Sequence, residues 1–373
     1  MKILVAGNLV NMGFEIVKAM REKNEDVYLL MPKFPRIHED PKSMYPYLEE
    51  DGYPKWIITF DNHNKSISWN NWKFQVIREM RKNYDVIIAL TEFSIFAMFS
   101  GKPYAALSTG SDMRELSFEK SFKGLLYRLS YRFARFVIWG EPDKRPLLKK
   151  LGIEKKAIFA IVPRNINFEP RSVKKNNLNK FIIFHPVSQN WKLKRNDIFL
   201  RAFVKLCDKR NDVYLILSER GHDIKKAKDI LSKGNASNSH EFVPLLNSEK
   251  MYYYYNLADV VVDQFGAGSF GMITVEAMKC AKAVILRLDE KLFKSCYKNI
   301  PEGIINTNTV EQVFYKLEKL LTKKKILEEL GKKNKDWVEK NWDKSKLAER
   351  YIKICQAIKQ NNLSVITIVD RIE

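Results

Sequence analysis

The sequence predicts an α/β protein made of two successive units, each with a parallel β-sheet covered by helices. Short apolar runs, which are typical of buried strands, alternate with stretches of helical periodicity along most of the chain. A polar, basic stretch with two prolines, Ile161–Leu178, interrupts this alternation near the middle of the 373 residues. A chain of this length is comfortable for two domains, so we expect a linker at this point.

The first alternation starts at the N-terminus. Helices are expected at Gly13–Glu22, Trp72–Arg81 and Phe118–Phe133, and Pro32–Tyr53 has the proline, tyrosine and charge content of a long loop. The expected strands are Ile3–Ala6, Val27–Met31, Trp56–Phe60, Val86–Leu90, Tyr104–Leu107 and Phe136–Trp139.

The second alternation follows the linker. Its expected strands are Phe181–Phe184, Val213–Leu217, His240–Val243, Val260–Val262 and Ala283–Leu286. Its expected helices are Asp197–Cys207, Asp223–Leu231, Ser248–Leu257 and Met272–Cys280, with Ser248 as an N-cap. After Thr309 the chain is mostly helical and highly charged, and a last helix is expected at Asp343–Gln360. The apolar, β-prone tail Ser364–Val369 is assigned to neither unit.

The charge balance of +21 describes a surface that attracts phosphates, anionic lipid or nucleic acid, or simply one with many solvated lysines. Nucleic-acid binding is not expected, because nothing but charge supports it. Four widely spaced cysteines without a CxxC pair indicate neither a zinc site nor a disulfide framework, which fits a reducing, cytoplasmic setting. The opening MKILVAG reads as a strand and not as a signal peptide, and no apolar run approaches the ~20 residues of a membrane span.

The segment Asp259–Leu286 is the strongest functional signal. It reads as strand, glycine loop, helix and strand, and three glycines, Gly266, Gly268 and Gly271, free the backbone to approach a ligand. A glycine loop that enters a helix presents unpaired N–H groups and a positive dipole end, which suit a phosphate. Glu276 lies about one turn inside the helix, where its carboxylate can accept hydrogen bonds from sugar hydroxyls. The alternative is an ordinary βαβ unit with a surface glutamate.

This segment resembles the signature of the retaining glycosyltransferases of group 1 (family 4), through Phe270, Gly271 and the Glu-Ala-Met that starts at Glu276. Three further stretches resemble the family: HPVSQNWKLKRNDIFLRAF, LLKKLGIEKKAIFAIVP and WVEKNWDKSKLAERYIKI. The resemblance covers about residues 120–360. It implies the fold called GT-B, with two Rossmann-like domains that face a cleft and a C-terminal helix that crosses back to the N-terminal domain.

The resemblance also implies a separate function for each part of the chain. Residues 1–165 would bind the acceptor, residues 166–345 would bind a nucleotide sugar, and residues 346–373 would form the returning helix and tail. The acceptor would be a glycan or a lipid-linked molecule. The nucleotide sugar would be a co-substrate, and no cofactor or metal is expected. The absence of an Asp-x-Asp pair agrees, because metal-dependent transferases hold a cation with such a pair.

The site residues follow from the resemblance and from the chemistry. Negative charge builds on the departing diphosphate, so fixed positive groups must face it. Lys194 would hold the diphosphate, and Glu276 the ribose diol. Asp112, after Gly110 at the end of strand Tyr104–Leu107, would orient the acceptor or act as a base, or would cap the next turn. The expected donor contacts are Glu276, Lys192, Arg195, Gly268, Ser269, Phe270, Gly271, Met272, Asp263, Gln264, Val243 and Gly13.

The sequence departs from the family pattern at three places. Gly268 stands where the first of two glutamates is usual, Ser188 stands where an arginine is usual, and the region LSTGSDMREL has Thr109 and Asp112 but no histidine. Asp263 and Gln264, and Lys192 or Arg195, could take over the first two roles. The departures also motivate a second hypothesis, a catalytically silent protein that binds nucleotide or glycan as a partner subunit.

The stretch Phe118–Ile138 interleaves cations with apolar residues. Its apolar residues are Phe122, Leu125, Leu126, Leu129 and Phe133, and its cations are Lys120, Lys123, Arg128, Arg132 and Arg135. This pattern fits a helix that lies on an anionic membrane, which would make the protein peripheral on the inner face of the membrane. It fits equally a domain helix with one core face and one solvated face.

Overall fold

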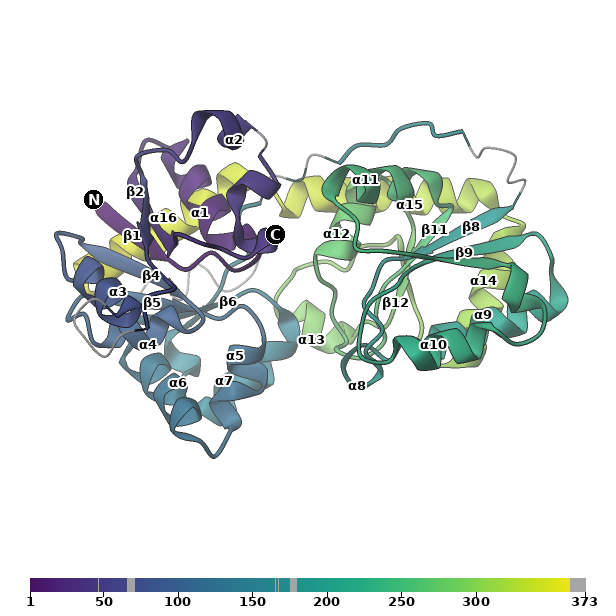
Figure 1. Cartoon of the computed structure of the whole chain (residues 1–373). Helices are drawn as coiled ribbons and strands as arrows, with labels where there is room; N and C mark the ends of the chain where they lie inside the picture. Colours follow the sequence, from purple (N-terminus) through teal and green to yellow (C-terminus); the bar gives the residue numbers. More distant parts are fainter. Residues whose placement is uncertain (46, 66–70, 165, 167, 175–179, 363–373) are drawn as a thin grey trace. The chain divides into compact units, whose positions relative to one another are not determined.

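The structure is a computed structural model, and it describes residues 1–45, 47–65, 71–164, 166, 168–174 and 180–362. These residues form two compact units (Figure 1). One contains residues 1–164 and the C-terminal helix α16 (Lys344–Gln360), and the other contains residues 166–341. The tail Ser364–Val369 lies outside the described residues. In the predicted linker, the described residues carry no helix or strand.

The first unit contains a parallel sheet in the order β3-β2-β1-β4-β5-β6-β7. Its strands are β1 (Lys2–Ala6), β2 (Asp26–Pro32), β3 (Ile57–Phe60), β4 (Val86–Leu90), β5 (Tyr104–Leu107), β6 (Phe136–Trp139) and β7 (Ala157–Phe159). The six expected strands are confirmed, and all but the edge strand β3 are short apolar runs that are largely buried. The edge strand β7 was not predicted.

The helices of the first unit are α1 (Met12–Arg21), α2 (Tyr47–Asp51), α3 (Trp72–Met80), α4 (Phe93–Met98), α5 (Ser111–Arg114), α6 (Phe122–Phe133) and α7 (Arg145–Leu151). The expected helix from Phe118 starts later, at Phe122, after a 3₁₀ turn (Leu116–Phe118). The Ser121 hydroxyl caps it by accepting from the Gly124 N–H at 3.1 Å. The expected loop at Pro32–Tyr53 contains α2.

The second unit contains a parallel sheet in the order β10-β9-β8-β11-β12-β13. Its strands are β8 (Phe181–His185), β9 (Val213–Ser218), β10 (His240–Val243), β11 (Val260–Val262), β12 (Val284–Leu286) and β13 (Ile304–Asn306). Its helices are α8 (Trp191–Lys194), α9 (Asn196–Lys209), α10 (Ile224–Leu231), α11 (Ser248–Leu257), α12 (Met272–Lys279), α13 (Glu290–Lys294), α14 (Val310–Leu321) and α15 (Lys324–Asn341). The predicted N-cap Ser248 is wrong by one residue: Asn247 caps α11, because its side chain accepts from the Lys250 N–H at 2.9 Å.

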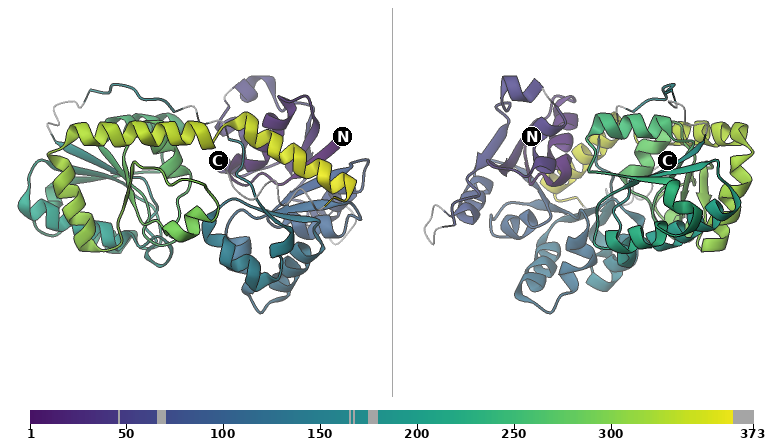
Figure 2. Two further views of the ribbon diagram at one scale, coloured as in Figure 1. Left: turned by 180° about the vertical axis from the view of Figure 1, so that it is seen from behind. Right: turned by 45° about the vertical axis from the view of Figure 1, so that its right-hand side comes forward.

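Helix α16 completes the core of the first unit. It packs against α1, and its buried apolar residues belong to the same cluster as Ile3, Phe14 and Val86 of that unit (Figure 2). These residues are Tyr351, Ile352, Ile354, Cys355, Ala357 and Ile358. The last helix therefore returns to the N-terminal unit, as expected.

Candidate functional site

The strand order of the second sheet reverses between β8 and β11. After β8 the chain continues to β9 and β10 on one side, and after β11 it continues to β12 and β13 on the other side. In open parallel sheets, ligands bind beyond the carboxyl ends of the strands at such a switch point. The loop after β8 carries Lys192–Arg195, and the loop after β11 carries Asp263–Gly271. The residues predicted to bind the donor phosphates thus flank the switch point.

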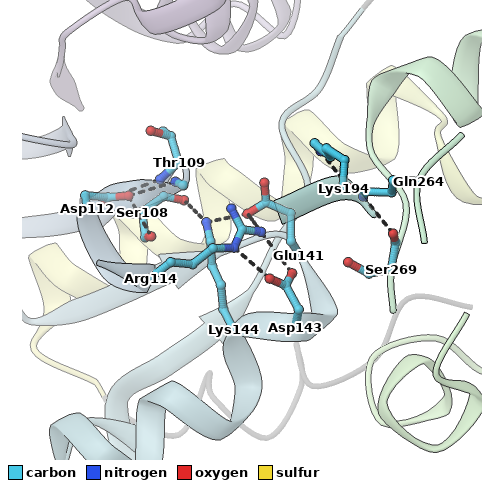
Figure 3. A network of polar contacts seen from close by, with 11 residues as sticks. Ser108, Thr109, Asp112, Arg114, Glu141, Asp143, Lys144, Lys194, Gln264 and Ser269 are labelled. Carbon is cyan, nitrogen blue, oxygen red and sulfur yellow. Dashed lines mark hydrogen bonds and ion pairs between the residues drawn. The ribbon is translucent and has the colours of Figure 1, made fainter. Parts of the chain in front are cut away.

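A chain of hydrogen bonds joins these two loops (Figure 3). Lys194 Nζ donates to Gln264 Oε1 at 2.6 Å, and Gln264 Nε2 donates to the Ser269 carbonyl at 2.9 Å. The backbones also meet, because the Phe265 N–H donates to the Lys194 carbonyl at 2.8 Å. The Lys194 ammonium is therefore held beside the glycine loop by a buried amide, and its orientation does not depend on a ligand.

The structure accounts for each of the three loop glycines in a different way. A Cβ at Gly266 would lie 1.9 Å from the Leu193 carbonyl oxygen, so this glycine allows the two loops to touch. Gly268 has a φ of +69° and a Cβ there would lie 3.0 Å from Asp289 Cβ. Only at Gly271 would a Cβ meet nothing within 4 Å. The prediction that all three glycines serve ligand approach is wrong for Gly266, and Gly271 is the one that leaves open space.

Helix α12 begins directly after this open glycine. Gly271 is its N-cap residue and no described side chain caps the helix, so the first-turn N–H groups, beginning with Met272, are open to an anion. Asp263 lies just behind, buried, and accepts from the Thr274 hydroxyl at 2.5 Å. Burial raises the pKa of Asp263, while Thr274, Lys194 and the amides of Gln264 and Gly271 lower it. Asp263 thus supports the loop, and we do not place it against the donor sugar.

Glu276 projects from α12 and is half-buried. It accepts a hydrogen bond at 3.0 Å from the hydroxyl of Tyr255, which lies fully buried on α11. Burial and the adjacent carboxylate raise the pKa of Tyr255 well above its usual range, so this hydroxyl stays protonated and remains a donor. Tyr255 therefore orients the Glu276 carboxylate. No pattern in the sequence distinguishes this tyrosine from its neighbours among the four consecutive tyrosines 252–255.

The remaining donor-site predictions separate into exposed and buried residues. Lys192 and Arg195 are exposed, and Arg195 lies 3.8 Å from Asp197. The Phe270 ring is buried against Phe293 and Trp337, with centroid distances of 5.2 and 5.9 Å, so the prediction of a donor contact by its side chain is wrong.

Val243, Gly13 and His185 also have structural explanations. Val243 ends β10, and its carbonyl accepts from the Glu219 N–H at 2.7 Å. A Cβ at Gly13 would lie 2.1 Å from the Gly7 carbonyl oxygen, so this glycine serves the packing of α1 and not a ligand. His185 is fully buried, and burial lowers its pKa to about 4. Its Nδ1 lies 2.9 Å from the Val262 carbonyl and its Nε2 lies 2.9 Å from Asn196 Nδ2, so the ring is a neutral structural group.

In the first unit, the loop after β5 is held by Asp112 (Figure 3). The carboxylate is buried and accepts from Gly110 N–H at 2.7 Å, Thr109 N–H at 3.3 Å, the Ser108 hydroxyl at 3.3 Å and the Tyr131 hydroxyl at 2.9 Å. These four donors occupy both oxygens. Asp112 is therefore a positioning residue, which corrects the expectation of a base or an acceptor contact. The buried Thr109 Oγ1 has no hydrogen-bond partner among the described residues.

Charged side chains brace the same loop from below (Figure 3). Lys144 is fully buried, pairs with Glu141 and donates to the Ser108 carbonyl at 3.1 Å. Arg114 makes a bidentate pair with Asp143, at 2.6 and 2.9 Å. Bidentate pairs are geometrically specific, and loss of Glu141 would remove a counter-charge of the fully buried Lys144 ammonium. The loop is therefore rigid.

A pocket of about 400 Å³ lies at the carboxyl ends of β1 to β4 of the first sheet, around its own switch point between β1 and β4. Its walls are aromatic, with Phe60 and Trp72 stacked at 5.9 Å, and Arg36 and Lys65 are among its polar lining residues. Two β-branched residues in the bordering loops, Val10 and Thr91, have φ values of +49° and +47°. Such strain costs about 1–3 kcal/mol and clusters at functional sites. The sequence did not point to this pocket, because its lining residues are scattered over residues 8–93.

No three His, Cys, Asp or Glu side chains gather into a metal-binding group within the described ranges. None of the described helices is long and apolar enough to cross a membrane.

Residues 166–337, most of the second unit, match the protein family described as glycosyl transferases group 1. None of the curated proteins matches the chain significantly. Solved structures match nearly the whole chain. HepE of Anabaena in complex with UDP-glucose is 14% identical, with a TM-score of 0.74 over 96% of this chain and 100% of HepE.

Sucrose-phosphate synthase from Thermosynechococcus elongatus is 13% identical, with a TM-score of 0.68 over 97% of this chain and 100% of the synthase. A glycosyltransferase from Rickettsia africae is 14% identical, with a TM-score of 0.65 over 97% of this chain and 99% of the other. At these identities the likeness shows the fold alone, and the expected GT-B fold with two Rossmann-like units is confirmed.

Proposed function

We propose that the protein transfers a sugar from a nucleoside-diphosphate sugar to a glycan or lipid-linked acceptor, because residues 166–337 match the glycosyl transferases of group 1. The observation that carries the proposal is the switch-point site of the second unit, where Lys194, the open N-terminus of α12 and the oriented carboxylate of Glu276 come together in one fold unit. The cation and the amides can bind a diphosphate. The two carboxylate oxygens can accept hydrogen bonds from a ribose diol.

In this proposal the reaction proceeds with retention and without a metal. The bond between the anomeric carbon and the diphosphate breaks through an oxocarbenium-like transition state, and the leaving diphosphate gains negative charge. Lys194 and the amide of Met272 stabilise that charge, because they are already fixed before the bond breaks. Retention rests on the family resemblance.

We assign the acceptor to the first unit. Its pocket offers aromatic walls for a sugar ring and polar groups that can fix its orientation, and its volume lies in the usual range for ligand sites. Replacement of Trp72 by Ala should raise the KM for the acceptor and leave the Kd of the donor unchanged. Phe74→Ala is the matched control, since Phe74 is an exposed aromatic of the same helix that does not line the pocket. An unchanged acceptor KM in the Trp72 variant would refute this assignment.

The second hypothesis, a catalytically silent nucleotide- or glycan-binding partner, is favoured by Gly268. Its left-handed backbone beside Asp289 leaves no room for the glutamate that is usual in the family. The two hypotheses differ in turnover: a silent protein would bind a nucleotide but release no nucleoside diphosphate from the sugar donor.

The experiment combines binding and turnover. Thermal unfolding is measured with a panel of nucleoside diphosphates and their sugar conjugates, beginning with UDP and UDP-glucose because HepE was solved with the latter. A ligand at a hundred times its Kd should stabilise the fold by about 2.7 kcal/mol. Release of diphosphate that disappears in Glu276→Ala and Lys194→Ala excludes the silent hypothesis. No stabilisation by any diphosphate nucleotide would contradict both.

We propose a cytoplasmic location. The support is chemical: the four cysteines are buried free thiols, which suits a reducing compartment.

A further inference from the structure

Helix α6 turns its apolar face outward. The helical period places Phe122, Leu125, Leu126, Leu129 and Phe133 on one face. Phe122 is 75% exposed, Leu125 42% and Phe133 64%, while Leu126 and Leu129 are half-buried. The helix does have one core face and one solvated face, as a domain helix has, but Phe122, Leu125 and Phe133 lie on the solvated face.

The opposite face of α6 fastens the helix to the first unit. Its buried residues are Gly124, Tyr127, Ser130 and Tyr131. The Ser130 hydroxyl lies 2.9 Å from that of Ser94 on α4, and the Tyr104 hydroxyl donates to the Ser130 carbonyl at 2.5 Å. The fold therefore holds α6 through small and hydroxylated residues, and Phe122, Leu125 and Phe133 remain exposed.

Cations border this apolar face. Lys120 and Lys123 are exposed at its N-terminal end, and Arg132 and Arg135 at its C-terminal end. Between Phe118 and Arg135 the sequence contains five basic residues and a single acidic one, Glu119. Phe118, which is 41% exposed, extends the apolar surface before the helix. We call residues 118–135 with these outward side chains the α6 face.

We propose that the α6 face docks on an anionic lipid bilayer, with α6 lying in the plane of the interface. Exposed phenylalanines and leucines can enter the boundary between headgroups and acyl chains, while flanking lysines and arginines pair with anionic headgroups. The surplus of cations complements a negative surface, and it would have to be neutralised if an ordinary protein covered the face. This inference deepens the proposed function, because it says where a lipid-linked acceptor would be met.

The test is co-sedimentation with two kinds of vesicles, pure phosphatidylcholine and equal parts of phosphatidylcholine and phosphatidylglycerol. The full chain should prefer the anionic vesicles by at least about tenfold at low salt, and lose that preference in high salt. The double variant Phe122→Ser with Phe133→Ser should bind at least about tenfold more weakly to anionic vesicles. Lys120→Gln with Lys123→Gln should bind about 25-fold more weakly, since each cation contributes about fivefold.

Matched controls come from the second unit. Tyr315→Ser removes an aromatic side chain that is 63% exposed on α14, and Lys324→Gln with Lys325→Gln removes two exposed cations of α15. Binding by these controls should stay within about twofold of the original chain. Thermal unfolding of every variant shows that its fold is intact.

Three results would overturn the proposal: no preference for anionic vesicles, an equal loss in the controls, or a concentration-dependent dimer that disappears in the Phe122 and Phe133 double variant. The last would mean that a second copy of the chain covers the face. Stabilisation by nucleotides is measured in the same variants and should not change. A chain that binds vesicles but no nucleotide would contradict the proposed function and leave this proposal standing.

Discussion

Lys194 and Gln264 lie on the two loops that flank the switch point of the second sheet, and Lys194 Nζ donates to Gln264 Oε1 at 2.6 Å. The amide of Gln264 is itself fixed, because its Nε2 donates to the Ser269 carbonyl. An ammonium held in this way needs little reorganisation when charge develops on a nearby phosphate. Preorganisation of this kind is where electrostatic catalysis gains most.

Replacement of Lys194 by Ala should lower kcat on the order of 10²–10³, because a lost transition-state contact to an oxyanion costs about 2.7–4 kcal/mol. Lys205→Ala is the control: it removes an exposed lysine of the following helix α9, outside the predicted site, and should change kcat less than about threefold. Steady-state release of the nucleoside diphosphate is the measurement. Equal effects of the two variants would show that only the general positive field matters.

The hydrogen bond between Tyr255 and Glu276 predicts that substitutions of the two residues weaken ribose binding to different extents. Glu276→Gln should weaken UDP binding about 10–100-fold, because charge-assisted hydrogen bonds contribute about 1.5–3 kcal/mol. Tyr255→Phe keeps the carboxylate but removes its orienting donor, and should weaken binding about 2–10-fold. Calorimetric titration with UDP and with its dideoxyribose analogue measures this. Glu276→Gln should bind the two nucleotides alike, and a discrimination that survives in this variant would remove the ribose role from Glu276.

Gly271→Ala should fold normally and lose activity. A Cβ at this position meets no protein atom within 4 Å and φ is −116°, so the change in stability should be within about 0.5 kcal/mol. The methyl group would enter the space that the donor phosphates need, and kcat/KM should fall by up to about 100-fold. Gly266→Ala gives the opposite pattern, because its Cβ would collide with the Leu193 carbonyl and destabilise the fold. A fully active Gly271→Ala variant would place the phosphates elsewhere.

His185 predicts a pH dependence of stability. Its pKa falls from 6.5 to about 4 on folding because burial disfavours the imidazolium. The folded state then binds fewer protons than the unfolded state, so this contribution is complete above pH 6.5 and is lost as the pH falls towards 4. The loss amounts to about 3 kcal/mol at most. Urea unfolding between pH 7.5 and 4.5 measures it, and His185→Gln should flatten the slope above pH 5. An equally steep slope in that variant would assign the effect to other groups.

The sequence was sufficient for the strands because burial on both faces leaves unbroken apolar runs such as Val86–Leu90 and Val260–Val262, whose bounds were predicted without error. It was insufficient for β7 and β13, which are three-residue strands at the edges of the two sheets. It also could not tell which face of α6 points inward. The inward face is chosen by contacts with Ser94 and Tyr104, which lie far from it in the sequence.

For the candidate site, the family motif predicted which loops form the site but not the role of each residue in those loops. Lys194, Gly271 and Glu276 lie where a donor could reach them, whereas Phe270 packs into the aromatic cluster and Asp112 is occupied by four donors. The contact between Tyr255 and Glu276 and the pocket around Trp72 depend on residues far apart in the sequence, so no local sequence pattern predicts them.

The return of α16 to the first unit has a consequence for biosynthesis. Ribosomes add about 5–20 residues per second, so roughly 10–40 s separate the synthesis of residue 164 from that of the helix that closes its core. During this interval the nascent first unit exposes the apolar groove that Tyr351, Ile354 and Ile358 later fill. Release of a chain that stops at residue 343 should yield a product that binds hydrophobic dyes and aggregates, whereas addition of a synthetic peptide of residues 344–362 should rescue it. The beginning of this protein therefore cannot finish folding before its end has been made.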